Sequence, residues 1–266
     1  MTQFIIGILL GALIGYGAYR AGALTHSGAW AAALTGGLIF GLGGFSWAVL
    51  LLTFFISSSV LSRTLLTRKE ALSEKFSKGS RRDYGQVLAN GGLGSLLAIA
   101  LALQPDQGWQ WVAFAGAMAA VNADTWATEL GILSPTLPHL ITSGKVVERG
   151  TSGGVTLVGY LAALGGAGLI GLAAVLFTPD TTWLGFVGIV ALAGLAGSTF
   201  DSLLGASLQA IYFCPQCQKE TEHHPVHGCG TETTIMRGWR WLNTDMVNVL
   251  CSLVGALVAV GLGYFI

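Results

Sequence analysis

Four acidic side chains stand in strongly apolar surroundings, where a charged group is costly. Asp124 and Glu129 belong to VNADTWATELG at the end of a long apolar run, Asp201 to GSTFDSLLGASLQ, and Asp245 to LNTDMVNVL. A single aspartate near a helix end is often only a cap, but ionisable groups within membrane segments usually face a cavity or a partner. Carboxylates that meet repel one another unless cations lie among them, and oxygen ligands suit magnesium. We therefore expect Asp124, Asp201 and Asp245 to hold Mg²⁺. Glu129 would be a further ligand or would support one.

The stretch ERGTSGGVT, residues 148–156, indicates an anion site. Glycines let a backbone pass close to a ligand, and a helix amino terminus offers N–H groups and a positive dipole end. A plain glycine-rich loop entering a membrane helix has the same pattern, and the G-K-[ST] of a Walker A motif is absent. We expect a phosphate cradle whose residues are Gly150, Thr151, Ser152, Gly153 and Gly154.

Basic and amide side chains accompany these two motifs. Arginine and lysine would offset the charge of a phosphate, and asparagine would orient a phosphate or a metal ion. The candidates are Arg81, Arg82, Lys145, Arg149, Asn90 and Asn248. Carboxylates for magnesium, backbone amides for phosphate and guanidinium groups for developing charge are the recurring parts of phosphoryl transfer.

A separate cluster, CPQCQKETEHHPVHGCG at residues 214–230, contains three cysteines and three histidines. C-x-x-C followed by a His/Cys pair has the spacing of a tetrahedral zinc site. The favoured ligands are Cys214, Cys217, His227 and Cys229, with His223 and His224 in reserve. A loose polar loop with incidental thiols is the alternative. Four protein ligands leave no position open, so the Zn²⁺ would be structural and would stiffen this loop.

The elements that must position these groups are membrane helices. The chain has 266 residues, of which 53% are hydrophobic and only 10% charged, whereas soluble domains are about 25% charged. We expect an all-α, polytopic bundle, with residues 1–266 as one membrane domain. A span needs roughly 20 residues. The predicted spans are 3–19, 24–43, 45–62, 86–104, 108–130, 154–177, 183–211 and 245–265. Residues 24–43 are rich in glycine, so seven spans is the alternative.

Small residues predict how the first span packs. Gly7, Gly11 and Gly15 recur every four residues, which is the spacing that lets two membrane helices approach closely. No positive leader or cleavage site precedes this span, so we expect it to be retained.

The distribution of charge predicts the topology. With eight spans all 13 basic residues fall on one side of the membrane, which the positive-inside rule makes cytoplasmic. They are Arg20, Arg63, Arg68, Lys69, Lys75, Lys78, Arg81, Arg82, Lys145, Arg149, Lys219, Arg237 and Arg240. Both termini would then be outside and the polar site would face the cytoplasm, as in a bacterial-type inner membrane. Zero net charge gives no surface for nucleic acid.

Two loops on the predicted cytoplasmic side are long. Residues 63–85 form a charged loop or amphipathic helix, LLTRKEALSEKFSKGSRRD at its centre, that would be solvated or interfacial, or alternatively a lid over a nucleotide. Residues 213–243 form a loop that carries the Cys/His insert.

Five stretches together resemble one known family. QVLANGG, NADTWATELG, GTSGGVT, FDSLLGASLQ and LNTDMVN occur in the order typical of the integral-membrane family of chloroplast phytyl-phosphate kinase and transmembrane protein 19, from about residue 81 to 253. The plant member converts phytyl monophosphate to the diphosphate in tocopherol synthesis. The resemblance implies a prenyl-phosphate kinase that uses CTP and Mg²⁺. It leaves open ATP as the donor, the length of the prenyl chain and a homodimer.

Other functions remain possible at this point. A polyprenol kinase would act on the free alcohol, and a CDP-lipid-forming cytidylyltransferase would release pyrophosphate. A transporter could use buried carboxylates for ions, but transporters typically show inverted repeats with sites near the membrane midplane. Here no repeat is evident and the polar groups favour one side. The expected partners are therefore a prenyl-phosphate lipid, a nucleoside triphosphate and the bilayer.

Overall fold

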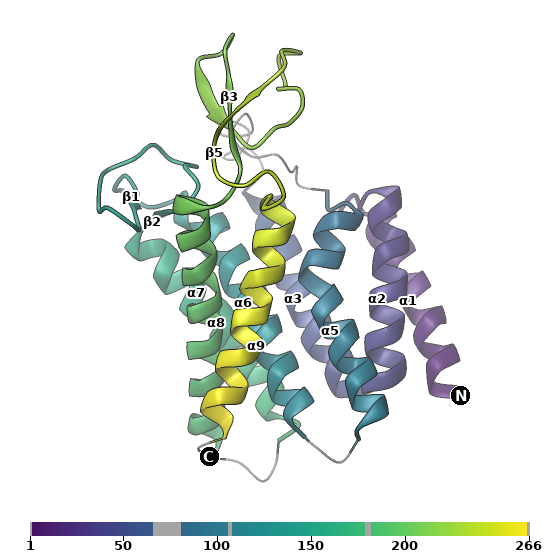
Figure 1. Cartoon of the computed structure of the whole chain (residues 1–266). Helices are drawn as coiled ribbons and strands as arrows, with labels where there is room; N and C mark the ends of the chain where they lie inside the picture. The colour runs from purple at the N-terminus through teal and green to yellow at the C-terminus, as the bar shows by residue number, and fades with distance from the viewer. Residues whose placement is uncertain (1, 66–80, 106–107, 179–181, 265–266) are drawn as a thin grey trace.

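The computed structural model describes residues 2–65, 81–105, 108–178 and 182–264 (Figure 1). Within them, eight long helices lie side by side and alternate in direction. They are α1 (Thr2–Arg20), α2 (His26–Gly43), α3 (Phe45–Thr64), α5 (Tyr84–Leu103), α6 (Trp109–Gly131), α7 (Leu157–Val175), α8 (Trp183–Ser207) and α9 (Thr244–Gly263). One helix thus lies at each of the eight predicted spans, including the glycine-rich second one.

Six of these helices are long and apolar enough to cross a membrane: α1, α3, α5, α7, α8 and α9. This confirms the expectation of a polytopic helical membrane bundle. The two other helices, α2 and α6, are not in this group, although each lies at a predicted span. Helix α6 contacts α3, α5, α7, α8 and α9, which makes it the centre of the bundle.

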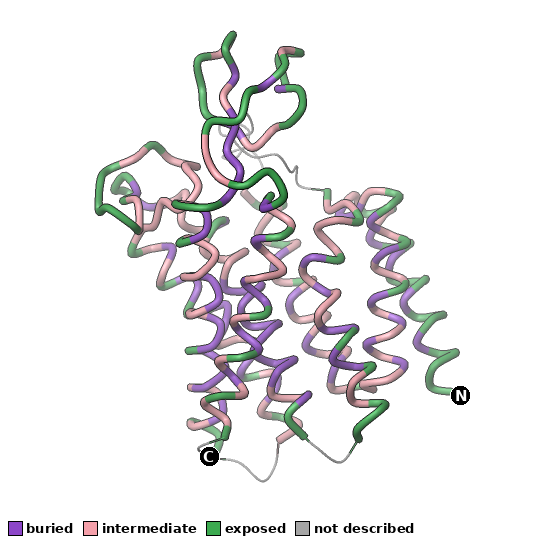
Figure 2. Tube along the Cα trace, in the orientation of Figure 1, coloured by how far each residue is buried: buried purple, intermediate pink, exposed green. Residues whose placement is uncertain are grey.

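The burial pattern is that of a protein in lipid. Along α6 the residues from Ala113 to Ala123 are buried, whereas large apolar side chains such as Leu9, Leu13 and Leu184 are exposed on the outer helices (Figure 2). Without a hydrophobic force between helices in lipid, close packing of small residues stabilises the bundle.

Glycine packing of α1 against α2 follows the predicted pattern. A Cβ added at Gly7, Gly11 or Gly15 would lie within 2.6–2.8 Å of a carbonyl oxygen of α2. The two helix backbones are therefore too close for any larger side chain at these positions.

Both β-sheets lie at the same end of the bundle (Figure 1). A two-stranded sheet pairs β1 (His139–Leu140) with β2 (Gly154–Val155), and a three-stranded sheet has the order β4 (Lys219–Thr221), β3 (Ile211–Cys214), β5 (Thr234–Arg237). These strands shorten two predicted spans. The sixth begins at Leu157 because β2 precedes it, and the seventh ends at Ser207 because β3 follows.

Caps fix the helices that begin at this end. Asp83 and Gln86 form a capping box at α5, while Thr156 caps α7 and Asn243 caps α9. The basic residues of the described chain also lie at this end, and α1 begins and α9 ends at the other. The charged helix or lid expected at 63–82 falls largely on residues 66–80, which lie outside the described residues.

Candidate functional site

A polar cavity of about 520 Å³ opens at the end of the bundle that carries the sheets. Its walls come from α3, α5, α6, α7, α8 and α9, from the loop before α7, and from the insert that follows α8. Among the predicted site residues, the lining includes Arg82, Asn90, Asp124, Glu129, Arg149, Gly150, Thr151, Ser152, Gly153, Gly154, Asp201 and Asn248. Segments far apart in the sequence therefore meet in one pocket.

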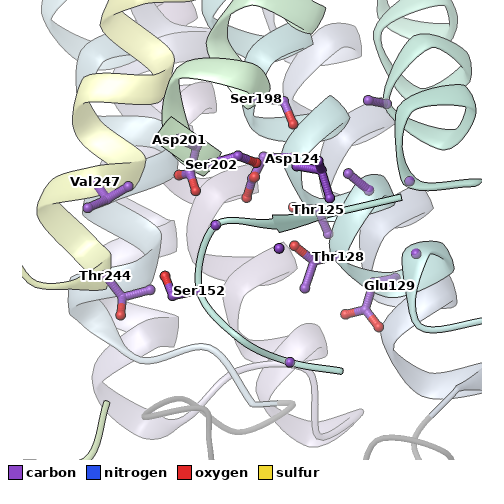
Figure 3. A pocket seen from close by; sticks show the side chains of 18 of the residues that line it. Asp124, Thr125, Thr128, Glu129, Ser152, Ser198, Asp201, Ser202, Thr244 and Val247 are labelled. Carbon is purple, nitrogen blue, oxygen red and sulfur yellow. The ribbon is translucent and has the colours of Figure 1, made fainter. Parts of the chain in front are cut away.

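Two helical stripes supply the acidic wall. On α6 the residues Asp124, Thr125, Thr128 and Glu129 line the cavity, and on α8 the stripe is Ser198, Asp201 and Ser202. Positions three and four apart share a helix face, which is why each stripe points one way. Figure 3 shows the two stripes on either side of the pocket, with the glycine-rich loop passing between them.

The Asp201 carboxylate has the surroundings expected of a cation ligand. Its Oδ2 is buried and accepts no hydrogen bond within the described part of the chain. Asp124 and Glu222 lie near enough for their charges to act on it. Buried carboxylates without a compensating positive charge are costly. The oxygen-rich donor set therefore fits a divalent cation such as Mg²⁺, held by Asp124 and Asp201.

Arg82 and Glu129 form the second charged region. Glu129 is buried, and its Oε1 accepts a hydrogen bond of 2.5 Å from the Ser62 hydroxyl. Burial lowers the pKa of Arg82 to about 10, and attraction to Glu129 acts in the opposite direction. Arg82 thus stays positively charged at neutral pH, beside the acidic wall.

The glycine-rich loop packs directly on α8. Gly150 and Gly153 have positive φ angles of 79° and 81°, in the region that favours glycine. A Cβ on Gly153 would lie 2.4 Å from the backbone nitrogen of Ala206, and one on Gly205 would lie 2.7 Å from Ser152 Oγ. These close contacts fix the position of the loop backbone against α8. The phosphate cradle was expected at the amino terminus of a helix. In the structure residues 150–154 precede α7, and Thr156 caps that helix by accepting a hydrogen bond from Gly159 N.

One cavity residue that the sequence analysis missed is Glu222, from the cysteine-rich insert. Its Oε1 accepts from Gln209 Nε2 at 3.0 Å, and its Oε2 accepts from the Thr244 hydroxyl at 3.0 Å. Gln209 Oε1 in turn accepts from Ser152 Oγ at 2.7 Å. This network joins the insert, the start of α9 and the glycine-rich loop. Nothing in the spacing of the insert singles out Glu222 from Glu220.

Three of the predicted site residues, Asp245, Arg81 and Lys145, do not line the cavity. On α9 the residues that face the pocket are Thr244, Val247 and Asn248. Asp245 is about 100° around the helix from Thr244. It points toward α5 instead, where a Cβ on Gly85 would lie 2.4 Å from its Oδ2.

The positions of Arg81 and Lys145 outside the cavity also follow from local geometry. Arg82 forms a β-bridge with Leu24, and successive side chains of an extended segment point to opposite sides. Arg81 therefore points away from the pocket and donates to Leu24 O at 3.2 Å. Lys145 is exposed in the loop between β1 and β2.

Above the cavity, the insert brings together the four favoured metal ligands. The ligand atoms of Cys214, Cys217, His227 and Cys229 all lie within 4.8 Å of one another. Neighbouring pairs are 3.3–3.6 Å apart. A tetrahedral zinc site with bonds of about 2.0–2.3 Å would place its ligand atoms roughly 3.4–3.8 Å apart. The cluster could hold a metal ion, and its donor set is that of structural zinc. His223 and His224 lie outside it; the His224 ring stacks on Tyr212.

Comparison with known proteins places the chain in a family. The family model described as "Integral membrane protein DUF92" matches residues 9–256. "Protein PGR" of Arabidopsis thaliana is 35% identical over 234 residues, covering 80% of this chain and 81% of that protein. "Uncharacterized membrane protein MJ0933" of Methanocaldococcus jannaschii is 34% identical over 77% of this chain and 83% of its own length.

A further plant relative agrees with the motif resemblance. "Protein VTE6, chloroplastic" of Arabidopsis thaliana is 26% identical over 253 residues, covering 91% of this chain and 66% of that protein. No solved structure matches the chain. The resemblance drawn from the five sequence stretches is thereby confirmed at the level of the family. The chain belongs to the DUF92 family of integral membrane proteins.

Proposed function

We propose that this protein is a prenyl-monophosphate kinase, which transfers a phosphoryl group from a nucleoside triphosphate, CTP by the family resemblance, to an isoprenoid phosphate. The observation that carries the proposal is the convergence of Asp124 and Asp201 with the glycine-rich loop and Arg82 in one cavity. Acidic, anion-binding and cationic groups are the parts that phosphoryl transfer needs. The cavity lies at the basic end of the bundle, which the positive-inside rule makes cytoplasmic, where nucleotides are available.

The cavity residues divide into two tasks. Asp124 and Asp201 would hold Mg²⁺, with Glu222 close to Asp201 and with Glu129 in the neighbouring charged region beside Arg82. When bound, the ion would neutralise charge on the phosphates. The backbone of residues 150–154 would position the triphosphate, and Arg82 and Arg149 would stabilise the charge that develops on the transferred group. Arg149 is held in place by donating to Ile132 O at 2.7 Å.

The acceptor chemistry explains why this cavity needs no general base. A prenyl monophosphate is already anionic at neutral pH, so its oxygen can attack without first losing a proton to the protein. Catalysis then consists of alignment and charge stabilisation. The oxygen of the acceptor bonds to the γ-phosphorus, the bond to the β-phosphate oxygen breaks, and the nucleoside diphosphate leaves.

The cysteine-rich insert has a supporting role in this proposal. Zn²⁺ bound by Cys214, Cys217, His227 and Cys229 would fix the insert. Because Glu222 belongs to the same segment and bonds to Gln209 and Thr244, the insert would in turn fix one side of the cavity.

The test is a reaction with purified protein in detergent or nanodiscs. Phytyl, farnesyl and geranylgeranyl monophosphates, and the corresponding alcohols, are each supplied with CTP, ATP, GTP or UTP, with and without Mg²⁺. We expect a prenyl diphosphate and CDP in equal amounts, only with Mg²⁺. Release of pyrophosphate with a CDP-lipid, phosphorylation of the alcohol alone, or no nucleotide turnover with any lipid would each overturn the proposal.

A further inference from the structure

A second cavity lies in the half of the bundle that supplies few site residues. It has a volume of about 350 Å³ and lies among α1, α2, α3 and α5. These helices stand together on one side of the bundle in Figure 1, apart from α7, α8 and α9. Ligand pockets typically have volumes of about 300–1,000 Å³, so this one is large enough for a ligand.

The wall of this cavity is almost entirely apolar. Of its described lining residues, the polar ones are Thr35, Arg82, Gln86 and Asn90. The Thr35 hydroxyl donates to Ala31 O of its own helix at 2.8 Å, so it offers little to a ligand. The rest of the lining is aliphatic, aromatic or glycine, with Phe54 and Phe55 nearest to the polar end.

The polar end of this cavity is shared with the candidate active site. Arg82, Gln86 and Asn90 line both cavities. Gln86 and Asn90 are four residues apart, and so lie one above the other on α5. Arg82 is the single charged group among the described residues of the apolar wall, and its guanidinium lies 5.2 Å from the centre of the Phe54 ring and 5.8 Å from that of Phe55.

The two cavities together are complementary to an anionic amphiphile. The cationic end of the apolar cavity meets the phosphate-handling site, and its lining on α1 extends from Gly7 to Ala18, about 16 Å along the helix axis at 1.5 Å per residue. Glycines at positions 36 and 91 leave the wall without side chains where there is room for one.

We propose that the cavity among α1, α2, α3 and α5 binds the isoprenoid tail of the lipid phosphate, with Arg82 holding its phosphate at the junction with the polar cavity. The isoprenoid identity of the tail rests on the proposed function; the binding of a long apolar tail with an anionic head rests on the cavities themselves. Helices α1, α2, α3 and α5 then form the lipid subsite of the enzyme.

Two glycines allow the cavity to be filled without disturbing the helices. A Cβ on Gly36 would lie 3.9 Å from its nearest neighbour, Leu51 Cδ2, and one on Gly91 would lie 3.8 Å from Thr35. Both are ordinary contact distances. Gly92 is the matched control, because it follows Gly91 on α5, does not line the cavity, and an added Cβ would meet nothing within 4 Å.

The experiment compares Gly36→Leu, Gly91→Leu and Gly92→Leu. A geranylgeranyl phosphate carrying a photoreactive diazirine at the tail end is cross-linked to each protein without nucleotide, and the adducts are mapped by mass spectrometry. We expect adducts on α1, α2 or α3 of the wild type. Labelling should fall about tenfold or more in Gly36→Leu and Gly91→Leu, since a misfit of one methylene between a ligand and a hydrophobic pocket is worth about 10–200-fold. It should be unchanged in Gly92→Leu.

Chain length separates this proposal from the kinase proposal. With dimethylallyl phosphate, whose tail is too short to fill the cavity, turnover should fall less in Gly36→Leu and Gly91→Leu than it does with geranylgeranyl phosphate. If no nucleotide is consumed with any lipid, the kinase proposal fails, while cross-links in the cavity would still support the tail site. Adducts confined to α6–α9, equal labelling in Gly36→Leu, or equal competition by phosphatidylcholine, which would mean bulk lipid only, would each overturn the tail site.

Discussion

At the scale of single residues, the direction in which a side chain points from its helix decides which carboxylates line the cavity. Asp201 lines the polar cavity, whereas Asp245 does not line it and faces α5. The two aspartates look alike in the sequence. The structure therefore favours Asp201 over Asp245 as a metal ligand, and activity measurements on variants of the two residues can test this difference.

We predict that Asp201→Asn lowers kcat by about 100-fold or more, as loss of an electrostatic group at a reacting centre does. Its midpoint of thermal unfolding should not fall, because the substitution removes an uncompensated buried charge. Asp245→Asn is the control and should have a clearly smaller effect. Initial rates at several Mg²⁺ concentrations and thermal unfolding check this. Wild-type kcat in Asp201→Asn would remove that residue from the metal site.

Glu222 gives a second prediction at this scale. Glu222→Ala removes the acceptor for Gln209 and Thr244, so the glycine-rich loop loses a connection to α9. The expected result is a fall in turnover of about tenfold or more through misalignment. Glu220→Ala, on the exposed side of β4, is the matched control and should behave as wild type. Equal activity of the two variants would contradict a role for Glu222 in the cavity.

At the scale of elements, the glycine-rich loop depends on its contact with α8. Gly153 combines a positive φ with an approach to Ala206 that excludes a Cβ, while Gly144 has a positive φ of 67° and open space around it. Substitutions at Gly144 and Gly153 therefore separate the cost of a left-handed backbone conformation from the cost of steric overlap with α8.

We predict that Gly144→Ala costs roughly 1 kcal/mol, the strain of a left-handed residue alone. Gly153→Ala should cost about 1–3 kcal/mol more because of steric overlap, and should also raise the KM for nucleotide. Thermal unfolding and nucleotide titrations measure the two effects. If both variants lose the same stability and keep the same KM, the loop is not held by α8 as described.

At the scale of the whole molecule, the alternating helices place both sheets and the described basic residues at one end. The positive-inside rule predicts that this end is cytoplasmic. Gln104 lies at the opposite end, after α5, and Ser143 lies in the loop between β1 and β2.

We therefore predict that a membrane-impermeant maleimide labels Gln104→Cys in intact bacterial cells, whereas it labels Ser143→Cys only after the membrane is broken. The wild-type protein, whose exposed Cys229 lies at the same end as Ser143, is the internal control and should also resist labelling in intact cells. The reverse pattern would place the candidate site outside.

The sequence by itself determined the features that depend on local order. Hydrophobic length predicted a helix at each span, and the four-residue glycine repeat predicted close packing of the first helix, though not its partner α2. The stripe from Asp124 to Glu129 follows from helical periodicity alone. The cysteine and histidine spacing identified a cluster that could hold a metal ion for the same reason, since its four residues lie within sixteen positions.

Only the tertiary structure decided which of these groups meet. Asp245 and Arg81 point away because the rotation of α9 and of the segment before α5 is set by packing on neighbouring elements, which no local pattern records. Glu222 lines the polar cavity because the cysteine-rich insert folds over that cavity. The apolar cavity forms because α1, α2, α3 and α5 leave a space between them. Periodicity fixes the face on which a residue lies, but long-range packing fixes what that face meets.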